Sequence, residues 1–111
     1  MINEYAKFTD KTAVYPDANT GNISEIMYLA LGLVGEAGEV GNKVKKFFRD
    51  NQTEDQEARA NVISECGDVA WYLMRLIRVL GGSPEDTIRA NWNKLQSRLE
   101  RNKLHGSGDK R

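Results

Sequence analysis

Cysteine and histidine are almost absent from this chain of 111 residues, which contains only Cys66 and His105. A single cysteine cannot form a disulfide within the chain, and Cys66 lies in an apolar stretch. We therefore expect Cys66 to be a small core residue in a reducing compartment. A single histidine cannot supply the paired E-x-x-H motifs of a di-iron helical bundle, which disfavours that class of protein. No arrangement of serine, cysteine and histidine suggests a covalent nucleophile.

Long apolar runs and an excess of charge are missing as well. No run has the length of a membrane span, and the sequence shows no signal peptide, which predicts a cytoplasmic protein without membrane partners. The 16 basic and 16 acidic residues cancel, so we expect no nucleic-acid partner. The charge is uneven, however, because residues 87–111 carry 7 basic and only 2 acidic residues. We expect residues 104–111 to form a flexible basic tail.

Strand signals are absent, and the chain divides into segments with helical apolar periodicity. Pro16 disfavours helical geometry at the residue before it, and Gly81 with Gly82 is a helix stop signal. Ser83 is a good N-cap, and Pro84 suits the first position of the helix that follows. We predict one all-α domain over residues 1–111, a four-helix bundle with helices over about 2–14, 24–48, 54–80 and 84–102.

The third predicted helix carries apolar residues around most of its circumference, from Val62 to Leu80. A helix in a four-helix monomer needs only one apolar stripe, so a helix that is apolar nearly all round is buried on several sides. A chain of this size also has a small core of its own. We therefore predict a homo-oligomer in which the second and third helices form part of the interface.

Two acidic pairs at the same spacing are the most informative feature of the chain. Glu36 with Glu39, and Glu65 with Asp68, each lie three residues apart, on one face of a helix and about 5–6 Å apart at Cβ. The pairs lie equally far before and after Gln52, so an antiparallel hairpin would bring them to the same height. Each like-charge contact there would cost roughly 3 kcal/mol at an effective dielectric of about 20. A hard divalent cation bound by the carboxylate oxygens would replace this repulsion with attraction. The alternative is a pair of solvated helix faces.

The residues around these acids resemble a known family. Gly35-Glu36-Ala37-Gly38-Glu39-Val40 and Glu65-Cys66-Gly67-Asp68-Val69 are similar to the ExxE and ExxD motifs of MazG-like nucleotide pyrophosphohydrolases, in the all-α NTP pyrophosphatase superfamily. The resemblance covers nearly the whole chain. It includes an N-x-x-K element at Asn91 and Lys94 and the tail 106–111.

The resemblance implies a Mg²⁺-dependent enzyme that cleaves a nucleoside triphosphate to the monophosphate and pyrophosphate, with Mn²⁺ as a substitute ion. It also implies a MazG-like fold assembled as a dimer or a dimer of dimers. The expected metal ligands are Glu36, Glu39, Glu65 and Asp68. The expected general base is Glu36 or Glu39, and the residues leave that choice open.

Helix geometry extends this site to the substrate. Lys43 and Lys46 lie one and two turns beyond the first acidic pair, where they would contact the outer phosphates or remain ordinary surface lysines. Tyr72 shares a helix stripe with Glu65 and Asp68, where it would pack under a base or fill the core. The remaining substrate-binding residues, expected from the resemblance and the tail, are Asn91, Lys94 and Arg111.

Glycine recurs every three residues inside the second predicted helix, at Gly32, Gly35, Gly38 and Gly41. Each costs about 0.5–1 kcal/mol relative to alanine, so close helix packing or room for a base is needed to explain them. Room for a base favours a purine deoxynucleotide such as dGTP. The alternatives are a dUTP, dCTP or phosphoribosyl-ATP pyrophosphohydrolase of the same superfamily, or a helical assembly module that binds metal without turnover.

Overall fold

The computed structural model describes residues 1–102 and 106–109, and this part of the chain consists of four helices without a strand. The helices are α1 (Ile2–Thr12), α2 (Ile23–Arg49), α3 (Gln56–Val79) and α4 (Pro84–Glu100). The all-α prediction is confirmed, and each helix lies within a few residues of its predicted range. No helix in the described ranges is long and apolar enough to cross a bilayer.

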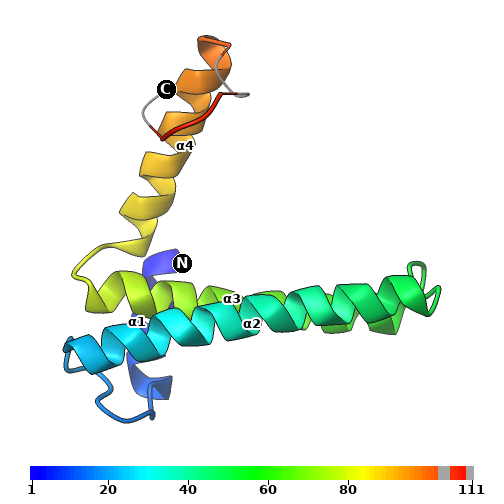
Figure 1. The fold of residues 1–111 in the computed structure, drawn as a ribbon. Helices are drawn as coiled ribbons and strands as arrows, with labels where there is room; N and C mark the ends of the chain where they lie inside the picture. Colours follow the sequence, from blue (N-terminus) through cyan, green and yellow to red (C-terminus); the bar gives the residue numbers. More distant parts are fainter. Residues whose placement is uncertain (103–105, 110–111) are drawn as a thin grey trace.

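The two long helices α2 and α3 form an antiparallel hairpin (Figure 1). The Asn22 side chain caps the start of α2 by accepting a hydrogen bond from the Glu25 amide, and Asp55 caps α3 through the Ala58 amide. Between the helices, Asn51 adopts a positive φ of 55°, a conformation that asparagine tolerates better than most residues. The hairpin sets the two acidic pairs opposite each other.

A buried polar network joins α1 to the open end of the hairpin. The Arg75 guanidinium on α3 donates hydrogen bonds to Asp10, Asn19 and Glu25, and Arg75 is only 1% exposed. The Glu25 carboxylate is fully buried and also accepts from the Tyr15 hydroxyl and the Asn19 amide. A buried ion pair needs such extra hydrogen bonds to offset the loss of water around both charges. The network therefore fixes α1 and the loop before α2 against α3.

The fourth helix projects away from the hairpin, so the predicted four-helix bundle is wrong for the single chain (Figure 1). Ser83 and Pro84 begin α4 as predicted. Asn3 on α1 donates a hydrogen bond to the Glu85 carboxylate and accepts one from the Glu85 amide, in the first turn of α4. Beyond that turn α4 leaves the rest of the chain. It contacts α1 and α3 and does not contact α2. Its apolar face consequently finds no partner within the chain; Trp92, for example, is 68% exposed.

The overall dimensions agree with an open protomer. Its radius of gyration is 16.9 Å, whereas a compact domain of this length would have about 13 Å. Its accessible surface of 8011 Å² exceeds by about 1,800 Å² the surface of a compact monomer of this size. The buried apolar residues in the described ranges are few: Ala6, Ala13, Leu29 and Pro84. Cys66, which we predicted in the core, is exposed because the protomer leaves that face of α3 uncovered.

The described part of the tail, residues 106–109, contacts α4. The Asp109 carboxylate accepts a hydrogen bond from the Lys94 ammonium at 2.7 Å and pairs with the largely buried Arg98. The prediction for Arg111 falls outside the described residues. The flexibility predicted for the whole tail stays a prediction.

Candidate metal centre

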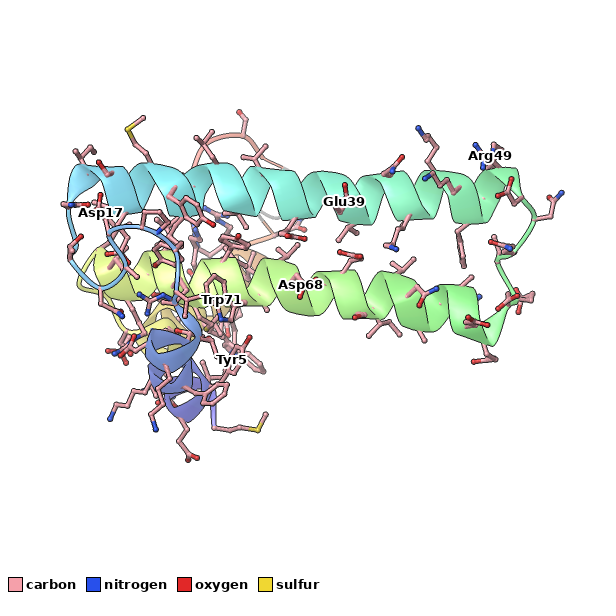
Figure 2. The ribbon with its side chains drawn as sticks, turned by 90° about the horizontal axis from the view of Figure 1, so that it is seen from below. Tyr5, Asp17, Glu39, Arg49, Asp68 and Trp71 are labelled. Carbon is pink, nitrogen blue, oxygen red and sulfur yellow. The ribbon has the colours of Figure 1, made fainter. Side chains whose placement is uncertain are left out.

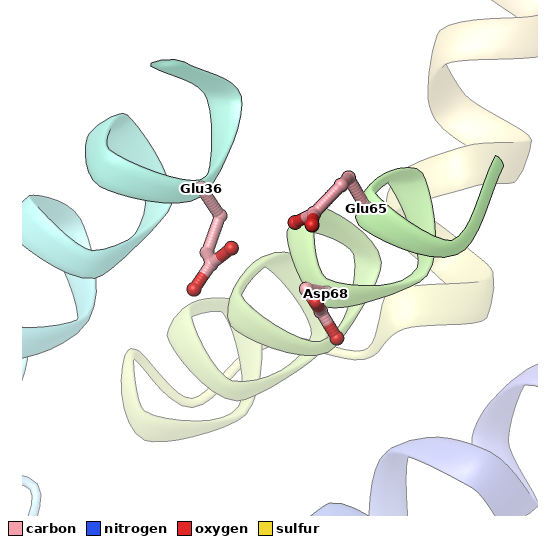
Figure 3. Close-up of side chains that lie close together, drawn as sticks. All are labelled: Glu36, Glu65 and Asp68. Atoms are coloured by element: carbon pink, nitrogen blue, oxygen red, sulfur yellow. The ribbon is translucent and has the colours of Figure 1, made fainter. Parts of the chain in front are cut away.

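Three carboxylates from the facing helices of the hairpin converge midway along its length (Figure 3). Glu36 lies on α2, and Glu65 and Asp68 lie one turn apart on α3. One oxygen of each carboxylate lies within 4.8 Å of the others. Glu36 and Glu65 are half-buried, whereas Asp68 is exposed. We call these three side chains the carboxylate cluster. The equal distance of the two acidic pairs from Gln52 along the chain predicts that these carboxylates lie close together.

The electrostatics of the carboxylate cluster disfavour full ionisation. Burial raises the pKa of Glu36, and the negative charges of Asp68, Glu65 and Glu39 raise it further. A divalent cation would remove this repulsion, since carboxylate oxygens are the ligands that Mg²⁺ and Mn²⁺ prefer. The donor set of the cluster therefore fits a hard divalent ion.

Glu39 does not belong to the cluster, although the sequence placed it among the ligands. It lies one turn beyond Glu36 on α2, nearer the turn of the hairpin than Asp68 (Figure 2), and its side chain is exposed. The three clustered oxygens come from the other members of the two acidic pairs. Glu39 therefore adds negative charge beside the cluster and contributes no oxygen to it in this conformation.

Two lysines predicted to bind phosphate lie beside the cluster. The Lys43 ammonium is 3.5 Å from a Glu65 oxygen, so it is in direct contact with the cluster. Lys43 and Lys46 also line a cavity of about 230 Å³ between α2 and α3, toward the turn of the hairpin. The other lining residues are Phe47, Asp50, Gln52, Ala58, Asn61 and Val62. An anion held by metal at the cluster would have positive charge and a polar cavity on this side. Sequence reasoning missed the contact between Lys43 and Glu65, because helix positions alone do not show how far the flexible lysine side chain reaches along the hairpin.

Tyr72 lies on the other side of the cluster, over Gly32. A Cβ at Gly32 would be only 2.2 Å from the Tyr72 ring, so this glycine is required by close packing between α2 and α3. Tyr72 is half-buried and meets Trp71 edge to face with 5.0 Å between the ring centroids. Burial raises the pKa of Tyr72, and Tyr28, Glu36 and Asp68 raise it further, which places the phenol near the carboxylates. A Cβ added at any of the other three glycines of the series would meet no atom within 4 Å, so only Gly32 is explained by packing within the chain.

Asn91 and Lys94 are not brought to the cluster within one chain. Both lie on α4, which does not contact the helix that carries Glu36. Lys94 is paired instead with Asp109 of the tail. A single chain therefore unites Lys43, Lys46 and Tyr72 with the carboxylates and leaves the N-x-x-K element outside.

Comparison with known proteins places these features in a family. The model of the MazG nucleotide pyrophosphohydrolase domain matches residues 25–102, which include the hairpin, the carboxylate cluster and α4. The chain is 42% identical over 112 residues to the Gene 37 protein of Mycobacterium phage L5, covering 99% of this chain and 98% of that protein. No solved structure matches the chain significantly. The domain match covers most of the chain and includes the three clustered carboxylates, so this chain belongs to the MazG nucleotide pyrophosphohydrolase family.

Proposed function

We propose that this protein is a Mg²⁺-dependent pyrophosphohydrolase that converts a nucleoside or deoxynucleoside triphosphate to its monophosphate and pyrophosphate. The observation that carries the proposal is the carboxylate cluster in a chain of the MazG family. Members of this family use a divalent metal, and the cluster offers the oxygen ligands for one. Mn²⁺ is expected to replace Mg²⁺, because both ions accept carboxylate oxygens.

Glu36, Glu65 and Asp68 would hold the ion or ions. When bound, the metal neutralises charge on the phosphate oxygens and lowers the pKa of a bound water. Glu39 is the better candidate for the general base, since it is exposed beside the cluster and has no oxygen within it. A carboxylate that is not engaged with metal remains free to accept the proton of the attacking water. Glu36, with its raised pKa, remains the second candidate.

The substrate would lie along the hairpin. Its outer phosphates would extend toward Lys43 and Lys46 at the polar cavity, where the ammonium groups oppose the negative charge. Its base would lie on the side of Tyr72. The open space beside Gly35 favours a larger base, and dGTP is our preferred substrate on that ground.

A second copy of the chain would complete the assembly. The apolar face of α4 and the uncovered faces of α2 and α3 favour a homodimer or a dimer of dimers. Because α4 does not contact its own α2, Asn91 and Lys94 would reach a bound nucleotide from a neighbouring subunit. The tail residue Arg111 would act from the same end of the chain.

A pyrophosphate-release assay over the canonical and several modified nucleoside triphosphates tests this proposal. We expect release with Mg²⁺ or Mn²⁺ and none in EDTA. Release confined to dUTP, dCTP or phosphoribosyl-ATP would favour a more specialised enzyme of the superfamily. If no nucleotide yields pyrophosphate although the metal binds, the protein is a metal-binding assembly module instead.

A further inference from the structure

Lys43 occupies the boundary between the carboxylate cluster and the polar cavity. Its ammonium lies 3.5 Å from Glu65, and the two side chains are 39% and 20% exposed. Among the residues that the structure describes, Lys43 is the basic side chain in an ion pair with the cluster. The same side chain lines the cavity that also contains Lys46, Gln52 and Asn61. One group therefore faces both the metal ligands and the space beyond them.

An ammonium at this point partly replaces a divalent ion. It supplies one positive charge to three carboxylates that repel one another, and Glu65 is the ligand that it engages. A metal ion would bring two charges and would use the same Glu65 carboxylate. Lysine carries its charge on a flexible stem of four carbons, so the ammonium can move while α2 stays in place. The adjoining cavity offers room for that movement.

We propose that Lys43 is a competing counter-ion of the metal site: it pairs with Glu65 in the metal-free protein and must leave Glu65 when a divalent ion binds. It then turns to the phosphates beside the ion. This inference rests on the proposed function, because it requires that the cluster binds metal. Lys43 would then have two opposite effects, because its positive charge weakens metal binding and strengthens nucleotide binding. The site would thus bind metal weakly alone and more tightly together with a triphosphate.

The charge of Lys43 can be removed with little change of shape by Lys43→Met. Methionine has a similar length and similar helix propensity, so α2 should remain intact. Without nucleotide, we expect this variant to bind Mn²⁺ about tenfold more tightly than the wild type, equivalent to about 1.4 kcal/mol. With Mg²⁺ present, we expect it to bind a non-hydrolysable nucleoside triphosphate about tenfold more weakly. A defect that merely disturbed the hairpin would weaken both.

Two matched variants serve as controls. Lys45→Met removes the same charge from an exposed position two residues away on α2 and should change Mn²⁺ affinity by less than about twofold. Lys43→Arg retains the charge and should keep metal affinity near that of the wild type. The electron paramagnetic resonance signal of free Mn²⁺ measures binding directly, without any turnover.

The outcomes separate this inference from the proposed function. Equal or weaker Mn²⁺ binding by Lys43→Met, with normal binding by the wild type, would overturn the role of Lys43 and leave the metal site intact. A similar increase in Mn²⁺ affinity in Lys45→Met would show that the effect comes from net charge alone, and it would also overturn the role of Lys43. If the wild type binds no Mn²⁺ at the cluster, so that Asp68→Asn changes nothing, the proposed function fails and the role of Lys43 fails with it.

Discussion

Asp68 and Glu65 reach the cluster from one helix and Glu36 from the other, so each carboxylate lies near two like charges. At about 5 Å and an effective dielectric of about 20, one such contact costs roughly 3 kcal/mol, less where water screens the exposed Asp68. The site is therefore a place where function opposes stability. Binding of a metal to the folded state should reverse the balance, because it adds stability by mass action.

This conflict predicts the effect of Asp68→Asn. We expect the variant to lose pyrophosphate release by at least about two orders of magnitude, since a ligand is lost and a charge no longer faces the metal. Its melting temperature without metal should equal that of the wild type or exceed it slightly. Differential scanning calorimetry and the release assay measure the two effects.

The control for Asp68→Asn is Glu57→Gln, which removes an acid from the exposed first turn of α3. It should retain activity, with a small loss of stability from the helix dipole, typically about 0.3–1 kcal/mol. An Asp68→Asn protein that unfolds, with activity lost only in proportion, would mean that the acid is structural and that the site is misassigned.

Gly32 and Gly35 form a second matched pair, in which only the surroundings differ. A Cβ at position 32 would meet the Tyr72 ring at 2.2 Å, whereas a Cβ at position 35 has no atom within 4 Å. We expect Gly32→Ala to destabilise the protein by about 1–3 kcal/mol and to displace Tyr72. Gly35→Ala should stabilise an isolated protomer by about 0.5–1 kcal/mol through helix propensity.

Urea unfolding at low protein concentration measures both glycine variants. Equal stability of Gly32→Ala and the wild type would show that the ring moves away without cost. If Gly35→Ala destabilises the protein only at concentrations where it self-associates, a second chain packs against that glycine.

Tyr15 predicts a pH dependence of stability on the alkaline side. Burial and the hydrogen bond that it donates to Glu25 raise its pKa from 10.0 to about 12. The folded protein keeps this proton over a range in which the unfolded chain releases it. The contribution is therefore fully present below pH 10 and is lost as the pH rises through about 12.

The absorbance of tyrosinate, followed as the pH rises, tests this directly. We expect one tyrosine of the wild type to titrate last and this component to be absent from Tyr15→Phe. Tyr72 also has a raised pKa, so the comparison with Tyr15→Phe identifies the residue. A late component that persists unchanged in the variant would contradict the assignment.

At the scale of the helices, local signals predicted the boundaries and the hairpin. Ser83 caps α4 as predicted. Asn22 and Asp55 cap α2 and α3 within two residues of the predicted starts, although the sequence prediction did not name them as caps. The convergence of Glu36 with Glu65 and Asp68 was also predictable, because it depends only on helix periodicity and the position of one turn.

The direction of α4 and the contact between Lys43 and Glu65 were not predictable in the same way. The first depends on how far the short segment 80–83 turns the chain, which periodicity does not encode. The second depends on side-chain conformation, because the hairpin has the predicted register, with Gly32 against Tyr72, and the long Lys43 side chain reaches Glu65 across it. Burial of Cys66 was a wrong prediction for a related reason: the apolar face of α3 has no cover within one chain.

The tail contact on α4 leads to a prediction for the C-terminal segment. Asp109 is exposed in its pairs with Lys94 and Arg98, and exposed ion pairs contribute little to stability. Deleting residues 104–111 should therefore change the melting temperature little. It should lower kcat/KM by about one or two orders of magnitude, through loss of charge-assisted contacts of roughly 1.5–3 kcal/mol each, discounted for ordering entropy.

Asp109→Asn is the control for this deletion, because it breaks the pairs with Lys94 and Arg98 and retains every basic residue of the tail. It should keep kcat/KM within about threefold of the wild type, as expected for loss of a surface ion pair. Full activity of the truncated protein would show that the tail takes no part in binding the nucleotide.

The whole molecule has more accessible surface than a compact monomer of its size. The excess of about 1,800 Å² approaches the area that one partner contributes to a large, obligate interface. Large exposed apolar side chains occur on every helix; examples are Phe8 on α1, Leu31 on α2, Ile63 on α3 and Trp92 on α4. So many large exposed apolar side chains favour the proposed self-association.

Self-association through α4 can be tested at Trp92. The residue is 68% exposed in the protomer and lines an apolar groove with Ile88, Leu95 and Leu99. Trp92→Glu should cost an isolated protomer little, but in a dimer it would bury a charge in place of an aromatic anchor, a loss of about 2 kcal/mol or more. We expect the wild type to sediment as a dimer or tetramer and Trp92→Glu as a monomer with little activity.

Ser97→Glu is the control for Trp92→Glu, because it adds the same charge on the opposite face of α4. It should preserve both assembly and activity. The melting temperature of the wild type should also rise with protein concentration, because association stabilises the folded state by mass action. A wild-type protein that is monomeric and fully active would refute assembly through α4 and would require Asn91 and Lys94 to act within one chain.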